Sequence, residues 1–189
     1  MLNLVVVTPP TDEPITLAQA KEHLRVDGTD EDALIGTYIS AARLKCEELS
    51  RRAFVTQTLA LVLDCWPDES IVKLPRPPLI SLTSVIYKDS TGTPTTWGSS
   101  NYVIDTFSTP GRLALASGMS WPGVTLYPIG GVKITYQAGY GAASAVPEIY
   151  KQAVKLLTAF YYENREQLDE IPKGIRDMLL SDRGWYFNG

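Results

Sequence analysis

The spacing of apolar residues changes twice along the chain, and these two changes restrict its fold class. Apolar side chains recur at helical spacing up to about residue 53, alternate as in strands over residues 54–145, and return to helical spacing from residue 146. Each helical end is too small for a core of its own and gains most by packing against the other. The sequence therefore predicts an α+β fold. Residues 1–53 and 146–189 would form a helical base, and residues 54–145 an inserted antiparallel β domain, either a sandwich or a small barrel.

The N-terminal part is expected to contain two helices. The segment Thr16–Gln19 has the spacing of a capping box and predicts a helix to about Arg25. Thr29 or Asp30 is expected to cap a second, longer helix that ends near Arg52. Acidic side chains in the first turn of this helix suit the positive end of its dipole.

The middle of the chain has the pattern of short strands separated by proline and glycine turn signals. The expected strands are residues 54–64, 71–74, 82–88, 102–105, 112–116 and 132–137. After Gln137–Gly141, helical spacing predicts a helix to about Glu166 and a short one over residues 173–181. Residues 4–7 are expected to be an extended arm, because the prolines that follow cannot donate a hydrogen bond to a sheet.

Composition and charge argue against several classes of function. The 189-residue chain has a formal net charge of -4, whereas proteins that bind nucleic acid electrostatically need a net basic face. One histidine, His23, and two cysteines, Cys46 and Cys65, leave little from which to build a zinc site or a histidine-dependent triad. Both thiols are expected to be reduced, with a disulfide as the open alternative. No segment has the length of a membrane span, so we expect a soluble protein with no catalytic residue, metal or cofactor.

Three local motifs could carry chemistry, and each has a simpler structural interpretation. Gln137–Gly141 lies where a phosphate-binding loop could lie, but it lacks the glycine spacing of such loops, which favours a tight turn. Glu163 and Glu166 could act as acid and base, but their helical turn also holds Arg165, which favours a salt-bridged face. Pro75–Pro78 lies between two predicted strands, which favours a turn over a polyproline ligand.

The aromatic residues leave two questions open. Trp66, Trp97 and Trp121 belong either to the core of the β domain, which is the commoner case, or to a carbohydrate-binding surface. Three adjacent aromatic residues near the C-terminus either fold back on the helical base or anchor a partner.

Several segments together resemble the head-to-tail connector proteins of tailed bacteriophages, which are also called head-completion or portal-adaptor proteins. Near the N-terminus these are TLAQAKEHLRV (residues 16–26), DED (30–32) and CEELSRRAF (46–54). Towards the C-terminus they are ITYQAGYG (134–141), VP (146–147), QA (152–153) and YYENRE (161–166). The signatures flank the β block, whose own match rests on position and strand-rich character.

This resemblance implies a structural virion protein of the neck, at the head–tail interface, made in the host cytoplasm. Members of the family assemble as a ring, commonly of twelve subunits, beneath the portal protein. The ring extends the DNA channel and docks the next neck or tail-completion protein, and double-stranded DNA passes through it without specific binding. The expected partners are therefore further copies of the chain, the portal and the next neck protein, with no membrane.

We expect charged side chains of the helical base to make most ring contacts and the C-terminal segment to engage the portal. The expected ring contacts are Arg43, Glu47, Arg51, Glu163 and Arg165. The expected portal contacts are Arg183, Trp185, Tyr186 and Phe187. Two other functions stay open: another neck component, such as a stopper or tail-completion protein, and a β-sheet carbohydrate- or ligand-binding module.

Overall fold

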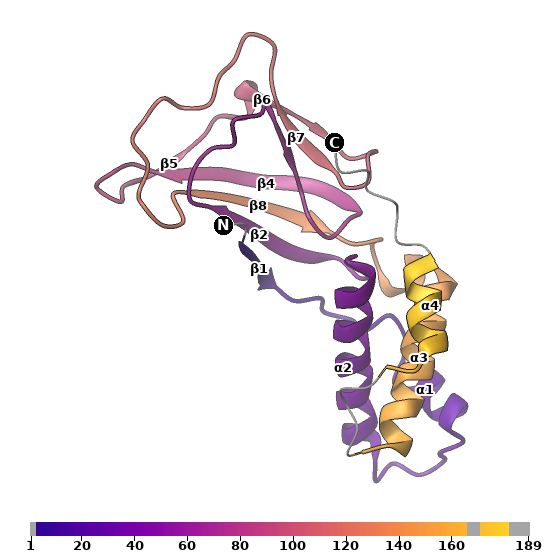
Figure 1. The fold of residues 1–189 in the computed structure, drawn as a ribbon. Coiled ribbons are helices and arrows are strands. Elements are labelled where there is room, and N and C mark those ends of the chain that lie inside the picture. Colours follow the sequence, from indigo (N-terminus) through magenta and orange to yellow (C-terminus); the bar gives the residue numbers. More distant parts are fainter. Residues whose placement is uncertain (1–2, 166–170, 182–189) are drawn as a thin grey trace. The chain divides into compact units, whose positions relative to one another are not determined.

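The computed structural model of the protein describes residues 3–165 and 171–181 (Figure 1). The chain divides into two compact units. The β unit comprises Met1–Pro10 and Thr56–Gly139, and the helical unit comprises Thr11–Val55 and Tyr140–Gly189. Helices near both ends and antiparallel strands between them confirm the α+β class expected from the spacing of apolar residues.

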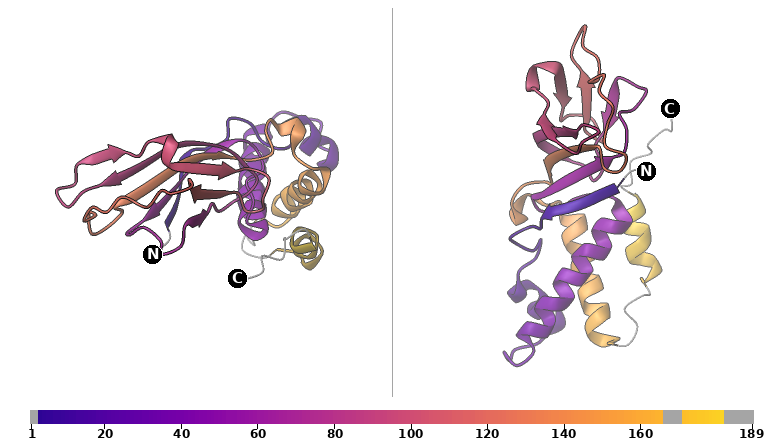
Figure 2. Two further views of the ribbon diagram at one scale, coloured as in Figure 1. Left: turned by 90° about the horizontal axis from the view of Figure 1, so that it is seen from above. Right: turned by 90° about the vertical axis from the view of Figure 1, so that its left-hand side faces the viewer.

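Two antiparallel sheets form the β unit (Figure 2). The larger sheet has the strand order β1-β2-β8-β4-β5, and the smaller has the order β3-β7-β6. The strands are β1 Asn3–Thr8, β2 Gln57–Leu63, β3 Ile71–Lys73, β4 Leu79–Lys88, β5 Pro94–Thr96, β6 Tyr102–Asp105, β7 Arg112–Leu115 and β8 Val132–Ala138. All six strands expected from the sequence are present; β6 has the expected bounds and the other five have one or both ends shifted.

The core of the β unit follows from the alternation along its central strands. In β8, buried residues alternate with residues that are exposed or half-buried, as expected for a strand with one face in a core. Leu59 and Leu61 of β2 pair with Tyr136 and Ile134 of β8, and all four side chains are fully buried. Register between these two strands is therefore fixed by the apolar face, since a shift of one residue would expose it.

The smaller sheet approaches the larger one closely where β7 begins. A Cβ atom at Gly111 would lie 2.4 Å from Cβ of Leu79, the first residue of β4. A side chain at Gly111 therefore cannot be accommodated without moving β4. The hydroxyl of Tyr136 also donates a hydrogen bond of 2.7 Å to the carbonyl oxygen of Pro75, in the turn between β3 and β4.

Two strands differ from the sequence prediction. Residues 4–7 do not form a free arm, because Asn3–Thr8 pairs with β2 and places the N-terminal residues in the β unit instead of the helical base. The prolines follow this strand and so end it without interrupting its hydrogen bonds. The short strand β5 was not expected, since it begins at Pro94 and has three residues, a combination that sheets accept at an edge.

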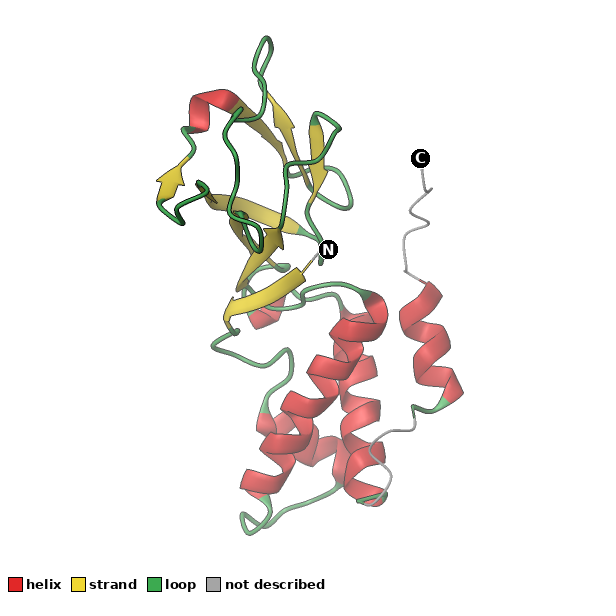
Figure 3. Cartoon of the chain, turned by 60° about the vertical axis from the view of Figure 1, so that its left-hand side comes forward, coloured by secondary structure: helices red, strands yellow, loops and turns green. Residues whose placement is uncertain are grey.

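The four α-helices belong to the helical unit (Figure 3). They are α1 Leu17–Leu24, α2 Asp32–Ser50, α3 Glu148–Glu163 and α4 Lys173–Ser181, and short 3-10 turns lie at Ser99–Asn101 (η1, β unit) and Ala143–Ala145 (η2, helical unit). The helices α2 and α3 pack against each other, and α1 and α4 each contact both. Their shared core includes the fully buried side chains of Ile35, Phe54, Tyr150 and Leu157.

The first residues of α1 and α2 show which capping signals in the sequence predict the helix start correctly. The capping box of α1 is confirmed: the Gln19 amide donates to Oγ1 of Thr16 at 3.2 Å, and the Thr16 amide donates to Oε1 of Gln19 at 2.9 Å. The cap expected for α2 was wrong. Its N-cap is Glu31, whose side chain makes no capping hydrogen bond because it is engaged elsewhere.

Candidate functional site

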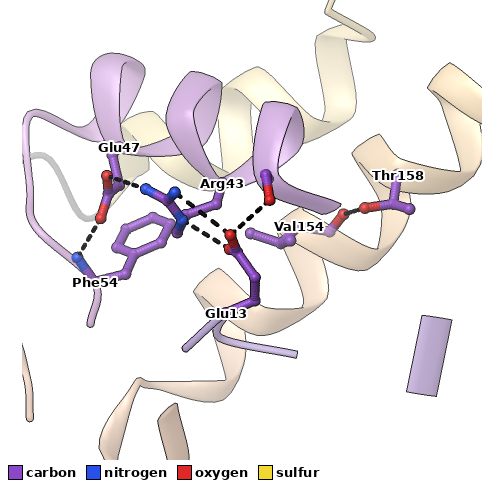
Figure 4. A network of polar contacts seen from close by, with 7 residues as sticks. Glu13, Arg43, Glu47, Phe54, Val154 and Thr158 are labelled. Carbon is purple, nitrogen blue, oxygen red and sulfur yellow. Dashed lines mark hydrogen bonds and ion pairs between the residues drawn. The ribbon is translucent and has the colours of Figure 1, made fainter. Parts of the chain in front are cut away.

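Arg43 and Glu47, two of the expected ring contacts, lie inside the helical unit (Figure 4). Arg43 is 6% exposed and Glu47 is 0% exposed. Nη1 of Arg43 lies 3.1 Å from Oε2 of Glu47, and Nε of Arg43 lies 2.7 Å from Oε2 of Glu13. The second carboxylate oxygen of Glu47 accepts a hydrogen bond of 2.8 Å from the amide of Phe54. Ser40 completes this network by donating to Glu13 at 2.7 Å.

The network joins three parts of the helical unit that are separate in sequence. Glu13 precedes α1, Arg43 and Glu47 lie on the inward face of α2, and Phe54 follows α2. Charged groups taken out of water require partners of opposite charge and full hydrogen bonding. The charges of Arg43 and Glu47 are therefore satisfied within the subunit, and these two side chains do not present a charged surface to a neighbouring copy.

Arg51, Glu163 and Arg165 are exposed. Arg51 ends α2 in the left-handed conformation, with φ 55°. Nη2 of Arg165 lies 2.7 Å from Oε1 of Glu31, and the guanidinium is 5.3 Å from the centroid of the Tyr162 ring. The structure thus brings Arg165 to the start of α2 and keeps it accessible, and Glu166 lies outside the described residues.

Glu31 gives the acidic segment before α2 a structural role. The Tyr162 hydroxyl donates a hydrogen bond to Glu31, and together with Arg165 it holds the pKa of that carboxylate below its usual range. The same contact raises the pKa of the Tyr162 phenol. Asp32, the next residue, pairs with Lys21 of α1 at 2.6 Å. These contacts connect the start of α2 to α1 and to the end of α3.

The expected portal contacts Arg183, Trp185, Tyr186 and Phe187 lie outside the described residues. Their assignment stays a prediction.

The three tryptophans of the β unit pack against one another. The rings of Trp66 and Trp121 are stacked, with centroids 4.9 Å apart, and Trp97 lies 5.5 Å from Trp66 and 5.3 Å from Trp121. Trp97 is buried, and Nε1 of Trp121 donates to the carbonyl oxygen of Glu69 at 3.0 Å. This arrangement favours the core interpretation, because Trp97 is buried and Trp66 and Trp121 each have one ring face covered by the other indole.

Neither cysteine forms a disulfide. Cys46 is buried in the helical unit, where burial raises the pKa of its thiol to about 12, and Cys65 is exposed in the β unit. Over residues 3–165 and 171–181, no three His, Cys, Asp or Glu side chains gather as metal ligands. Nor, within the same ranges, does any helix have the length and apolar character needed to cross a bilayer.

Exposed apolar side chains of the β unit were not identified from the sequence. Phe107 is 98% exposed in the turn between β6 and β7, and Val103 of β6 is 57% exposed. Val5, Val6 and Val7 of β1 are each more than 40% exposed. A sequence signal was present in the uncharged run LVVV of residues 4–7, but exposure depends on which strands lie at the sheet edges, and strand order is not encoded locally.

Asp105 holds the turn that carries Phe107. Its carboxylate accepts hydrogen bonds from the amides of Phe107 and Ser108 at 2.9 and 3.1 Å, and from the Ser108 hydroxyl at 2.5 Å. It also pairs with Nη2 of Arg112 at 2.6 Å. These contacts, those of Ser108 first, lower the pKa of Asp105 well below its usual range. The exposed phenyl ring therefore lies on an ordered turn.

The Asp105 contacts predict a dependence of stability on pH. Because the folded-state pKa lies below the unfolded value, the contribution of Asp105 is fully present above about pH 5 and is lost as pH falls below about 4, towards the folded pKa. Asp105→Asn should therefore flatten the acid limb of a plot of melting temperature against pH between about pH 5 and 2. Asp68→Asn removes a carboxylate elsewhere in the β unit and controls for the change in net charge. An acid limb in Asp105→Asn as steep as that of the wild type would contradict the prediction.

Two comparisons with known proteins find matches to proteins of phages or phage-like particles. Residues 14–89 match the family described as phage gp6-like head-tail connector protein. The fold matches a chain in the neck of an empty gene transfer agent (GTA) particle, computed with C6 symmetry, with 28% identity, a TM-score of 0.78, and coverage of 97% of this chain and 95% of that one.

A chain in the neck of the native GTA particle, computed with C12 symmetry, also matches, with 28% identity and a TM-score of 0.75 over 97% of this chain and 94% of that one. A chain of the native GTA virion matches with 27% identity and a TM-score of 0.78 over 95% and 94%. No curated protein sequence matches the chain. The chain is thus similar to phage head-to-tail connector proteins over residues 14–89 and, over nearly its whole fold, to subunits of the necks and virion of gene transfer agent particles.

Proposed function

We propose that the protein assembles as a ring of twelve subunits beneath the portal, where it extends the DNA channel and docks the next neck protein. The observation that carries this proposal is the match over 97% of the chain to a subunit of a neck computed with C12 symmetry. Because both units are covered, the fold as a whole, and not only its helical part, is common to the two proteins. A structural role accounts for the chain without any catalytic group.

The exposed charged residues of the helical unit suit contacts between subunits. Arg51, Glu163 and Arg165 are accessible, and a closed ring needs two different, complementary surfaces on each subunit. Arg43 and Glu47 contribute indirectly, since their buried network fixes the shape of the unit that carries these surfaces.

The charge of the chain supports a channel that does not retain DNA. A protein with a net charge of -4 has little electrostatic affinity for a duplex as a whole. A wall of low affinity lets DNA pass during packaging and ejection, whereas a basic wall would hold it through release of counterions.

The C-terminal segment is proposed to attach the ring to the portal. Deleting residues 182–189 should abolish attachment and leave the isolated subunit folded, because the described helical core, which extends to Leu179, is retained. Aromatic side chains are frequent anchors at protein interfaces, where their burial offsets the entropy lost on ordering.

This proposal is tested by mixing purified portal with wild-type or truncated protein and counting portals with an added ring by electron microscopy. A matched variant, Trp185→Ala/Tyr186→Ala/Phe187→Ala, keeps the chain length and removes the aromatic groups. Both variants should retain the wild-type melting temperature and fail to add a ring. Ring addition at the wild-type level by both would refute the assignment of the tail.

A further inference from the structure

The N-terminal strand β1 is an open edge of the larger sheet. It pairs with β2 on one side, and within residues 3–165 and 171–181 no strand pairs with its other side. The strand has six residues, NLVVVT, with neither a charged residue nor a proline. Val5, Val6 and Val7 are 43%, 42% and 47% exposed, so valines project from both faces of the edge. Such an edge readily pairs with another strand.

A second open edge lies in the smaller sheet. Strand β6 pairs with β7 on one side and is the last strand in the order β3-β7-β6. Val103 on this strand is 57% exposed, and Phe107, just beyond it, is 98% exposed on the turn that Asp105 orders. The charge of Asp105 at the end of the strand is compensated by Arg112, so the exposed part of this edge is apolar.

The remaining edges of the β unit carry the usual protection against pairing. Strand β5 has three residues and begins with Pro94, and β3 has three residues and ends with the exposed Lys73. Short length, proline and lysine are features with which natural proteins blunt sheet edges. In the described β unit, β1 and β6 therefore differ from the other two edges by being both apolar and unprotected.

The two unprotected edges lie on opposite sides of the β unit. In Figure 1, β1 is the lowest strand of the larger sheet and β6 lies at the top of the unit, with β8 and β4 between them. The right-hand view in Figure 2 shows the same separation. In a ring of identical subunits, one side of each subunit faces the opposite side of the next. Two different apolar edges in these places are what a closed heterologous contact requires.

We propose that β1 of one subunit packs against β6 and Phe107 of the adjacent copy, so that the β units form a continuous contact around the ring. This inference rests on the proposed ring. Main-chain hydrogen bonds between the two edges would satisfy their unpaired groups, and the valines would cover the Phe107 ring. The occupant of both edges is thus a second copy of this chain.

Substitutions on both sides of the contact test this proposal. Val5→Lys/Val7→Lys places two charges on β1, and Val103→Lys/Phe107→Ser removes the apolar partner. Each should lower the number of rings formed on purified portal by about tenfold or more, because charged groups would be buried without partners or anchor area would be lost. Ile129→Lys is the matched control, since Ile129 is 78% exposed in the loop before β8 and lies on neither edge.

A crosslink tests the same contact without weakening it. In a Cys65→Ser background, which removes the exposed native thiol, Val5→Cys and Val103→Cys in one chain should yield disulfide-linked oligomers up to the full ring after oxidation on the portal. A variant with only one of the two introduced cysteines should give no disulfide-linked oligomers. This measurement tests the contact between β1 and β6 even if the lysine variants fail to fold.

The outcomes separate this inference from the proposed function. If wild-type protein forms no ring on the portal, the proposed function fails first. If wild-type and both edge variants form rings equally and no crosslink appears, the edge contact is refuted while the ring stands. Variants that form normal rings but no longer bind the next neck protein would show that the edges face a different partner, which also overturns the inference.

Discussion

Glu47→Ala is expected to lower the free energy of unfolding of the helical unit by about 3 kcal/mol. The substitution removes the acceptor of the Phe54 amide and one of the two carboxylates that surround Arg43, which is 6% exposed. Arg43 would keep Glu13, but part of its buried charge would lose compensation. Loss of helical circular dichroism with increasing denaturant measures the effect.

Glu48→Ala is the matched control for this prediction. Glu48 is the next residue of α2 and pairs with Lys45 at 3.1 Å, but its side chain is 65% exposed. Exposed pairs contribute about 0–1 kcal/mol, so this variant should be nearly as stable as the wild type. Equal losses in the two variants would show that the buried network does not have the importance assigned to it.

Phe54→Ala is expected to cost about 4 kcal/mol of stability in the same assay. Phe54 is 0% exposed and stacks on Tyr150 of α3, with ring centroids 4.6 Å apart and an angle of 25° between the planes. Alanine would leave a cavity between the segment that follows α2 and the first turns of α3, and it would also remove the aromatic contact.

Phe107→Ala provides the control, because it deletes the same side chain from a position that is 98% exposed. Its effect on the stability of the isolated subunit should stay within about 0.5 kcal/mol. A similar loss in both variants would contradict the account of the core. Small stability losses in both Phe54→Ala and Phe107→Ala would also contradict it.

Local signals predicted the helices well. The capping box at Thr16 and Gln19 marked the start of α1, and apolar spacing located α3 and the bounds of α4. The start of α2 was misassigned because Glu31 has a more favourable use than capping. It binds Tyr162 and Arg165, which lie more than 130 residues away in sequence, and no local rule contains that information.

The buried charges show a second limit of reasoning from sequence. Arg43 and Glu47 are four residues apart on a helix, a spacing that is typical of exposed ion pairs. Their burial is decided by Glu13 and by the return of the chain at Phe54, both of which come from outside the helix. Only the tertiary structure distinguishes a pair that stabilises the subunit from one that is available to a neighbour.

The strands show the same distinction between local and non-local information. Alternation and β-branched residues located the central strands, but the order β1-β2-β8-β4-β5 brings together residues far apart in the chain. Local patterning predicts an arm at residues 4–7, because the partner strand β2 begins at Gln57, far along the chain. The exposed edges on which the inferred subunit contact depends follow from that order.

The proposed formation of a ring on the portal is tested most directly by electron microscopy of the purified wild-type protein mixed with purified portal. One additional ring is expected on each occupied portal, with twelve-fold symmetry in class averages viewed along the channel. Portals that remain bare at saturating concentrations of folded protein, or that bind it as single copies without a closed ring, would contradict it.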